Sequence, residues 1–160
     1  MNIRLFQPGD EDALWSLLEP TFRSGDTYAF PSDCSRESAL HYWLNPAHTV
    51  YICEFGAVPA GTYLLRANQP GGGAHVANCG FITAPAARGR GVASAMCRHA
   101  LATARARGFK AMQFNFVVST NTGAIRLWEA MGFATLARLP GAFLHPAKGF
   151  VDALVMFREL

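Results

Sequence analysis

Hydrophobic positions follow two different periods along this chain, and the way these periods alternate predicts its secondary structure. Runs in which apolar residues are continuous or alternate with polar ones predict strands, whereas apolar residues spaced three and four apart predict helices. The predicted strands are residues 2–7, 49–55, 59–66, 74–83, 110–118, 133–138 and 151–158. The predicted helices are residues 10–19, 35–44, 90–107 and 121–131.

Two segments rich in glycine or proline, 70–73 and 139–150, interrupt these patterns, and we expect both to be loops rather than domain linkers. The order of the elements predicts an α/β (α+β) fold, in which a mixed sheet carries helices on both faces. With 160 residues, of which 51% are hydrophobic and 16% charged, the chain has enough apolar material for one core. We therefore expect a single domain over residues 1–160.

The charge of the chain is small but unevenly placed. The net charge is +3, and six of the 14 basic residues fall within residues 88–110. Such a segment can attract phosphate groups, although a solvated helix face is the alternative for Arg105 and Arg107. No basic stripe interleaved with aromatic residues is present, so we expect no nucleic acid partner. The apolar runs are too short to span a bilayer and the chain begins with a strand pattern, so we expect no membrane partner and a cytoplasmic location.

The four cysteines are spaced irregularly, with no Cys-x-x-Cys pair and no histidine at the interval of a zinc ligand. Cys53 and Cys79 lie in predicted strands and Cys97 in a predicted helix, so burial is the expected state of these three. We therefore expect reduced thiols, no bound metal and no nucleophilic cysteine.

Residues 85–93 form a glycine-rich turn that carries arginines and lies between a predicted strand and a predicted helix. Glycines let a backbone approach an anion closely, and a helix N-terminus presents free N–H groups and a positive dipole end. No Gly-Lys-Ser/Thr ending is present, and Ser94 stands where a dinucleotide fingerprint has its third glycine. The turn is thus predicted to bind a pyrophosphate, unless it is a plain strand-to-helix turn.

A second motif, residues 121–133, begins with an asparagine that can cap a helix and ends with Gly132-Phe133. Together with Arg88-x-x-Gly91-x-Ala93, it resembles the GNAT superfamily of acetyl-CoA-dependent N-acetyltransferases. That family carries Arg/Gln-x-x-Gly-x-Gly/Ala and then Asn-x-x-Ala-x-x-Leu-Tyr-x-x-x-Gly-Phe. The likeness covers residues 74–135 well, and the N-terminal third resembles the family only in its pattern.

The resemblance implies the GNAT fold, a mostly antiparallel sheet in which the strands 74–83 and 110–118 are parallel and splay apart. It implies acetyl-CoA as cosubstrate, with its acyl chain in the gap between these strands. The family is often dimeric, so a homodimer is compatible with the resemblance. The residues expected to bind the cofactor are Phe81, Ile82, Thr83, Arg88, Gly89, Arg90, Gly91, Val92, Ala93, Asn121 and Trp128. Backbone N–H groups near residues 81–83 would hold the pantetheine arm and polarise the thioester carbonyl.

Two asparagines, Asn78 and Asn115, lie inside strongly apolar predicted strands and must be hydrogen-bonded if they are buried. They either face a cleft or satisfy backbone groups where the strands splay. The set of Asn78, Asn115 and Asn121 is similar to a GNAT branch of fungal enzymes that acetylate proline analogues such as azetidine-2-carboxylate. That resemblance implies that Asn78 and Asn115 contact the acceptor and order the reacting groups.

Proton transfer is the least determined part of the prediction. Trp128 stands where many family members have a tyrosine that protonates the leaving thiolate, and an indole N–H is not acidic enough for that task. Glu54, His75 and His145 are candidate general bases by residue type, and a water molecule held by the two asparagines is the alternative. Each of the three side chains also has a purely structural interpretation.

The leading hypothesis is an N-acetyltransferase for a small-molecule amine, such as an amino acid or a proline analogue, acting in detoxification. The acceptor would be bound by Tyr28, Phe30, Asn78, Asn115 and His145, although the loop that carries Tyr28 and Phe30 could equally belong to the core. The alternatives are acetylation of a protein or peptide and a non-catalytic module that binds acyl-CoA.

Overall fold

The computed structural model describes all 160 residues. The strands are β1 Asn2–Leu5, β2 Thr49–Phe55, β3 Val58–Ala67, β4 Val76–Thr83, β5 Ala111–Val118, β6 Ala134–His145 and β7 Gly149–Glu159. The helices are α1 Glu11–Ser24, α2 Arg36–Trp43, α3 Val92–Ala106 and α4 Thr122–Ala130, and short 3-10 turns lie at Gly71–Gly73 and Pro85–Ala87. None of the helices is both long and apolar enough to cross a membrane.

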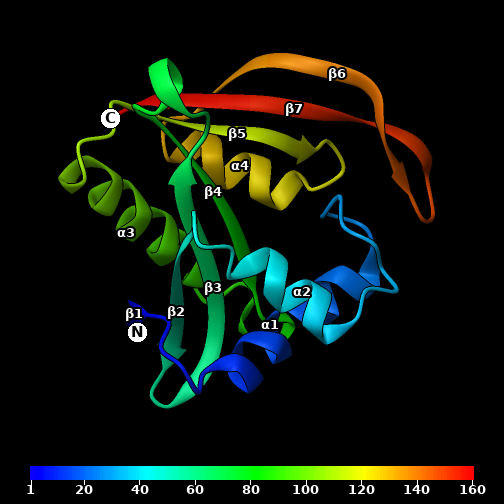
Figure 1. Cartoon of the computed structure of the whole chain (residues 1–160). Helices are drawn as coiled ribbons and strands as arrows, with labels where there is room; N and C mark the ends of the chain where they lie inside the picture. The colour runs from blue at the N-terminus through cyan, green and yellow to red at the C-terminus, as the bar shows by residue number, and fades with distance from the viewer.

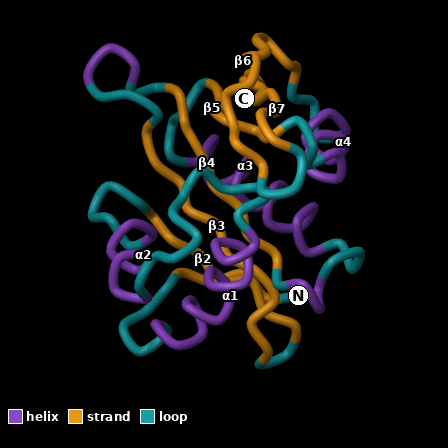
Figure 2. The backbone as a smooth tube through the Cα atoms, turned by 90° about the vertical axis from the view of Figure 1, so that its right-hand side faces the viewer, coloured by secondary structure: helices purple, strands orange, loops and turns teal.

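The seven strands form one sheet in the order β1-β2-β3-β4-β5-β7-β6. All neighbours are antiparallel except β4 and β5, which are parallel and connected through α3. Helices α1 and α2 lie together beside β2 and β3, whereas the long β6–β7 hairpin occupies the opposite end of the molecule (Figures 1 and 2). This arrangement confirms the predicted α/β class and the mixed, mostly antiparallel sheet.

Apolar side chains on the two faces of the sheet form two separate cores, because neighbouring residues of a strand point to opposite faces. Tyr63 and Leu65 of β3 join the core under α3 and α4, whereas Leu64 joins the core under α1 and α2. The central strand β3 is therefore buried on both faces. Trp43 of α2 fixes its own core to this strand through an indole N–H that donates to the Thr62 hydroxyl at 3.3 Å.

The parallel pair β4–β5 separates almost as soon as it begins. Pairing is limited to Val76 with Ala111 and Ala77 with Met112. Beyond these positions β4 remains paired with β3, while the register of β5 against β7 shifts between Phe114 and Val117. Such an irregularity bends the strand that carries it. The sheet consequently opens into the gap that the sequence led us to expect between these two strands.

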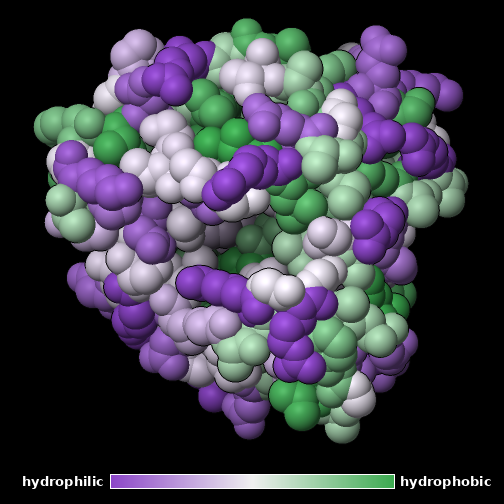
Figure 3. All heavy atoms as spheres, turned by 180° about the vertical axis from the view of Figure 1, so that it is seen from behind, coloured by the Kyte–Doolittle hydropathy of each residue, from purple (hydrophilic) through white to green (hydrophobic).

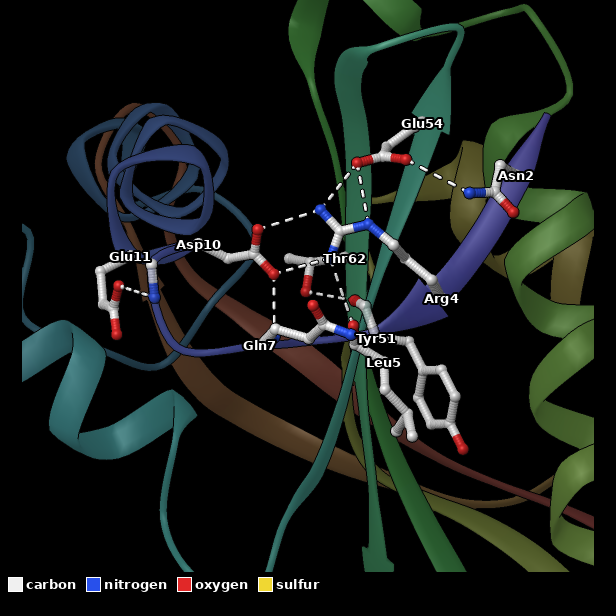
Figure 4. Close-up of polar contacts among 10 residues, drawn as sticks. Asn2, Arg4, Leu5, Gln7, Asp10, Glu11, Tyr51, Glu54 and Thr62 are labelled. Atoms are coloured by element: carbon white, nitrogen blue, oxygen red, sulfur yellow. Dashed lines mark hydrogen bonds and ion pairs between the residues drawn. The ribbon is translucent and has the colours of Figure 1, made fainter.

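Arg4 ties the first strand to the rest of the fold (Figure 4). Its guanidinium pairs with Asp10, just before α1, at 2.6 Å and with Glu54 of β2 at 2.8 Å. The hydrogen bond from Arg4 holds the pKa of Asp10 below its usual value. The carboxylates of Asp10 and Glu54 therefore have a structural role, because both are paired with Arg4.

The two largest differences from the expected boundaries involve prolines. Helix α1 continues past Pro20 to Ser24, because the burial of Phe22 outweighs the loss of one backbone donor. Residues 139–150, expected to be a loop, instead form the end of β6 and the start of β7. Pro140 fits there because β6 is the edge strand and its register shifts between Leu139 and Phe143.

All four cysteines are free and buried, as expected for structural thiols. Cys53, Cys79 and Cys97 belong to the core under α3 and α4. Burial raises the pKa of Cys97 to about 12 and also raises the pKa of Cys79. A thiol of this kind stays protonated at neutral pH and is a poor nucleophile.

We predict that Gly61→Ala destabilises the protein by about 1–3 kcal/mol. A Cβ at this position would come within 2.8 Å of the Met96 side chain and 2.9 Å of the Ile82 carbonyl oxygen, and the carbonyl cannot move without disturbing the sheet. Urea unfolding measures the effect. The matched control is Gly123→Ala in α4, which has open space and should be unchanged or slightly more stable. Equal stability of the two variants would contradict the close packing of α3 on the sheet.

We also predict that Cys97 resists alkylation in the folded protein. At pH 8 an ordinary thiol with a pKa of about 8.5 is roughly a quarter thiolate, whereas a pKa of about 12 leaves about one part in 10⁴. Iodoacetamide should therefore modify Cys97 at least about 10³-fold more slowly in the native state than in urea. The rate should rise with pH, because the thiolate fraction grows toward the raised pKa. Rapid native alkylation of Cys97, detected by peptide mass spectrometry, would contradict this burial.

Candidate active site

A cavity of about 310 Å³ lies where β4 and β5 separate. Leu64, Arg66, Asn78 and Gly80 line it from the face of the sheet that carries α1 and α2. Lining residues from the other face, part of or packed on the core under α3 and α4, are Cys79, Phe81, Phe114 and Trp128. Because residues from both faces line one space, the cavity passes through the sheet at the gap. Figure 3 shows the molecule from behind, with a hollow that has an apolar floor and a polar rim.

Asn78 bridges the two strands at the first position where they no longer pair. Its side chain is 8% exposed, and its Nδ2 donates to the Gln113 carbonyl oxygen of β5 at 2.8 Å. Its Oδ1 accepts a hydrogen bond from Nε of Arg66 at 3.3 Å. The amide thus satisfies a carbonyl left without a strand partner, and the residue also lines the cavity. Both interpretations of this buried asparagine apply to the same side chain.

Asn115 is held inside the cavity by two further amides. Its Oδ1 accepts from Nε2 of Gln113 at 2.9 Å, and its Nδ2 donates to Oδ1 of Asn68 at 2.7 Å. Gln113 links the two asparagines through two different groups, because its main-chain carbonyl oxygen accepts from Asn78 and its side-chain Nε2 donates to Asn115. This amide chain, formed by Arg66, Asn78, Gln113, Asn115 and Asn68, fixes the orientation of both predicted asparagines.

The loop before α2 contributes one of its two predicted aromatic residues to the cavity. Tyr28 lines it, and a Cβ on Gly80 would overlap the Tyr28 hydroxyl. Burial raises the pKa of Tyr28, so the phenol remains neutral at physiological pH. Phe30 does not line the cavity, because its ring packs against other aromatic rings. The centroid of its ring lies 4.7 Å from that of Phe22 and 4.8 Å from that of Tyr42.

Trp128 forms an aromatic wall of the cavity on the α4 side. Its ring lies 5.1 Å from Phe81 and 5.0 Å from Phe114, and the residue is 7% exposed. Its indole N–H makes no hydrogen bond within the protein. No buried side-chain nitrogen lacks a partner, so this N–H is reachable by solvent or ligand. The side chain therefore combines a packing surface with one free donor.

None of the three candidate bases reaches the cavity. Glu54 is paired with Arg4 on β1 (Figure 4). His75 is exposed and its Nδ1 lies 3.1 Å from the Gly72 carbonyl oxygen. His145, also expected to bind the acceptor, instead accepts the Ala147 N–H at 3.1 Å in the β6–β7 turn. The cavity is lined by no carboxylate and no imidazole.

The glycine-rich loop presents a set of free backbone donors at the start of α3. Gly91 is the N-cap in the left-handed region with φ 79°, and Gly89 has φ 73°. The residues whose backbone N–H groups donate to no group of the protein are Gly89, Gly91, Val92, Ala93 and Ser94. We call these five unpaired N–H groups at a helix N-terminus the anion cradle, because such groups can bind an anion. Pyrophosphate binding there stays a prediction. Arg90 lies beside it, with its guanidinium 4.3 Å from the Phe55 ring.

Along β4, the register decides which backbone groups face the gap. The Val76 carbonyl oxygen accepts from the N–H of Asn68, directly after β3, and the Ala84 N–H donates to the Ala60 carbonyl oxygen of β3. The even-numbered residues of β4 therefore direct their N–H and C=O groups toward β3. Ile82 pairs with Thr62 in the same register, and its side chain is buried in the core under α1 and α2. The amides of Phe81 and Thr83 therefore face the gap, and the amide of Ile82 does not.

Asn121 caps α4 and lines the cavity at the same time. Its Oδ1 accepts the Ala124 N–H at 3.3 Å, while its Nδ2 has no partner in the protein. The cap interpretation and the binding interpretation are thus compatible, because they use different atoms of one amide.

Sequence reasoning missed three members of the amide chain, namely Arg66, Asn68 and Gln113. Arg66 lies opposite Asn78 in the β3–β4 register, and Asn68 contacts Asn115 across 47 residues of sequence. A polar residue near the end of a strand ordinarily faces water, so the sequence offered no signal for these positions. Only the pairing of distant strands brings them to the cavity.

Comparisons with known proteins agree with this geometry. N-acetyltransferase aca1 of Schizosaccharomyces pombe is 34% identical over 96 residues, which make up 59% of this chain and 46% of that protein. The match thus spans about half the length of this curated relative. The structure of a GCN5-related N-acetyltransferase from Kribbella flavida is 36% identical, with a TM-score of 0.93 over 99% of this chain and 97% of that chain.

A phosphinothricin acetyltransferase from Sinorhizobium meliloti, solved in complex with AcCoA, has a TM-score of 0.86 over 99% of this chain and 88% of that chain. At 17% identity this likeness shows the fold alone. The profile of the acetyltransferase (GNAT) family matches residues 12–133, which include the gap, the anion cradle and α4. The chain therefore belongs to the acetyltransferase (GNAT) family, which confirms the predicted family.

Proposed function

We propose that this protein transfers the acetyl group of acetyl-CoA to the amine of a small molecule. The observation that carries the proposal is the cavity that passes through the sheet where β4 and β5 separate. Its lining includes Asn121 and Trp128 at α4 on one side of the sheet and Tyr28 and Tyr42 on the other. Two substrates can therefore approach one point from opposite faces of the sheet.

The residues present fit a coenzyme A thioester. The five free N–H groups of the anion cradle suit a pyrophosphate, and the Phe81 and Thr83 amides along the gap suit a pantetheine arm. When bound, acetyl-CoA supplies the activated thioester carbonyl. The free Nδ2 of Asn121 and the indole N–H of Trp128 are additional donors at the end of this path.

Within the cavity, the protein orients groups rather than moving protons through a strong acid or base. Asn115 is locked by Gln113 and Asn68, so its remaining N–H is a fixed donor for the acceptor or for the developing oxyanion. Because no carboxylate or imidazole lines the cavity, the amine loses its proton to a water molecule held by the amide chain. Tyr28, with its raised pKa, stays a neutral hydrogen-bonding wall.

A small acceptor fits the cavity better than a protein chain. Residues 27–29 and Tyr42 line the cavity on the α2 side, and the ring centroid of Tyr28 lies 5.8 Å from that of Trp43. A peptide acceptor needs an open groove with backbone partners, which these aromatic side chains do not provide. A proline analogue or another amino acid is the finer proposal, supported by the two asparagines and by the fungal relative.

We predict that Asn115→Ala lowers the rate of thiol release from acetyl-CoA by about 10²-fold with the preferred amine. The substitution removes the oriented donor and leaves Gln113 and Asn68 without their shared partner. Free thiol is measured across a panel that contains azetidine-2-carboxylate, hydroxyprolines, other amino acids, polyamines and a lysine peptide.

The matched control is Asn45→Ala, an exposed asparagine outside the cavity, which should keep the wild-type rate. Full turnover by Asn115→Ala would remove this residue from the mechanism. Turnover of the lysine peptide alone would move the assignment to a protein acceptor.

We also predict that Gly91→Ala weakens the binding of coenzyme A by about tenfold, whereas Gly149→Ala does not. Both glycines have a left-handed backbone, with φ 79° and φ 70°, and neither has an atom within 4 Å of an added Cβ. Each substitution should therefore cost a similar 1–2 kcal/mol or so of stability. Only Gly91 positions the anion cradle, so isothermal titration with coenzyme A separates the two. Equal affinities would show that the cradle is not the pyrophosphate site.

A further inference from the structure

Arg66 is a cation without a counter-ion inside the cavity. It lies on β3, is partly buried and lines the cavity beside Asn78. Only its Nε atom is used, in the hydrogen bond to Asn78 Oδ1 at 3.3 Å. The two terminal nitrogens, Nη1 and Nη2, make no hydrogen bond within the protein, and none of its ion pairs includes Arg66.

The surroundings do not compensate this charge. The cavity is lined by no aspartate or glutamate. The nearby imidazole of His48 has a pKa lowered mainly by burial and also by the charge of Arg66, so His48 stays neutral. A partly desolvated guanidinium without a carboxylate partner is costly unless an anion binds to it.

The geometry of the guanidinium suits a planar anion. The bond from Nε to Asn78 fixes the plane of the group and leaves the pair Nη1 and Nη2 free as a fork. Such a fork binds a carboxylate through two parallel hydrogen bonds. Asn78 is in turn bonded to Gln113, so the fork is held by the same amide chain that orients Asn115.

The rest of this wall carries no charge and is mostly apolar, with the Tyr28 hydroxyl as its polar group. Leu64 and Gly80 occupy the next paired position on the same face of β3 and β4, and the Tyr28 hydroxyl lies over Gly80. A ligand in this half of the cavity thus meets a positive group at one end and an apolar surface beside it. A free α-amino acid has this pattern, because a single carbon atom separates its carboxylate from its amine.

We propose that Arg66 binds the carboxylate of the acceptor, so that the acceptors of this enzyme are amino acids with a free α-carboxylate rather than simple amines. The inference rests on the proposed function and assigns its substrate class. Asn78 is then a positioning residue for Arg66, and the carboxylate at Arg66 places the α-amine toward Asn115 and the gap. An uncharged carboxamide in the same place would leave the guanidinium unpaired.

The test compares acceptors that differ only in the carboxylate, with free-thiol release as the readout. The pairs are azetidine-2-carboxylate with azetidine, and proline with pyrrolidine and prolinamide. For the wild-type protein we expect kcat/KM to be about 10²-fold or more higher for the carboxylate-bearing member of each accepted pair. Cyclopentanecarboxylate should inhibit competitively, and cyclopentanecarboxamide should not.

Arg66→Gln should remove this preference, chiefly through a rise of KM for the carboxylate-bearing acceptor that is much larger than any change for pyrrolidine. Arg66→Lys keeps the charge but loses the fork, so an intermediate preference is expected. Asn115→Ala serves as contrast, since it should lower kcat for both members of a pair. Inhibition by cyclopentanecarboxylate should be lost in Arg66→Gln, which tests the site independently of turnover.

The outcomes are distinguishable. If the wild type releases no thiol from acetyl-CoA with any amine, the proposed function itself is refuted. Turnover of amines with no preference for the carboxylate overturns only the role of Arg66. An equal loss for both members of a pair in Arg66→Gln also overturns it, because that result assigns the residue to the support of the sheet. If Arg66→Gln does not fold, the paired acceptors and inhibitors on the wild type and on Arg66→Lys decide the question.

Discussion

The separation of β4 from β5 after two paired positions governs the rest of the molecule. A sheet that opens exposes backbone groups that require new partners, and burying them unpaired is costly. Asn78 satisfies the first of these groups by donating to the Gln113 carbonyl oxygen. The strands can thus remain apart while the two cores on either side of the sheet stay packed. Residues from both faces of the sheet line the cavity at the gap that results.

The amide chain that satisfies the backbone at the gap also positions side chains that line the cavity. The bond that stabilises the open sheet also fixes Arg66, and the next bonds in the chain fix Asn115 beside the gap. Stability and substrate orientation are therefore not independent here. A change at Asn78 should disturb both, whereas a change at Arg66 or Asn115 acts on the ligand side of the network.

Much of this architecture follows from local patterns. The hydrophobic periods locate nearly every element, and the two motifs locate the anion cradle and the cap at Asn121. The errors have specific causes. A proline normally ends a strand in the middle of a sheet, but Pro140 is tolerated because β6 is the edge strand. The roles of Arg66 and Asn68 could not be predicted, because they arise from contacts across 12 and 47 residues that no local pattern encodes. Residue type alone also misled for Glu54, a candidate general base whose carboxylate is instead paired with Arg4.

The central claim is that coenzyme A extends from the anion cradle into the gap between β4 and β5. A crystal structure of the protein with coenzyme A tests this claim most directly. The account predicts the pyrophosphate on the free N–H groups of Gly89 and of residues 91–94, and the thiol in the gap, beside Phe81 and Asn115. It also predicts that the amide chain stays intact in that complex. A thiol lying outside the gap, with β4 and β5 unchanged, would contradict the account.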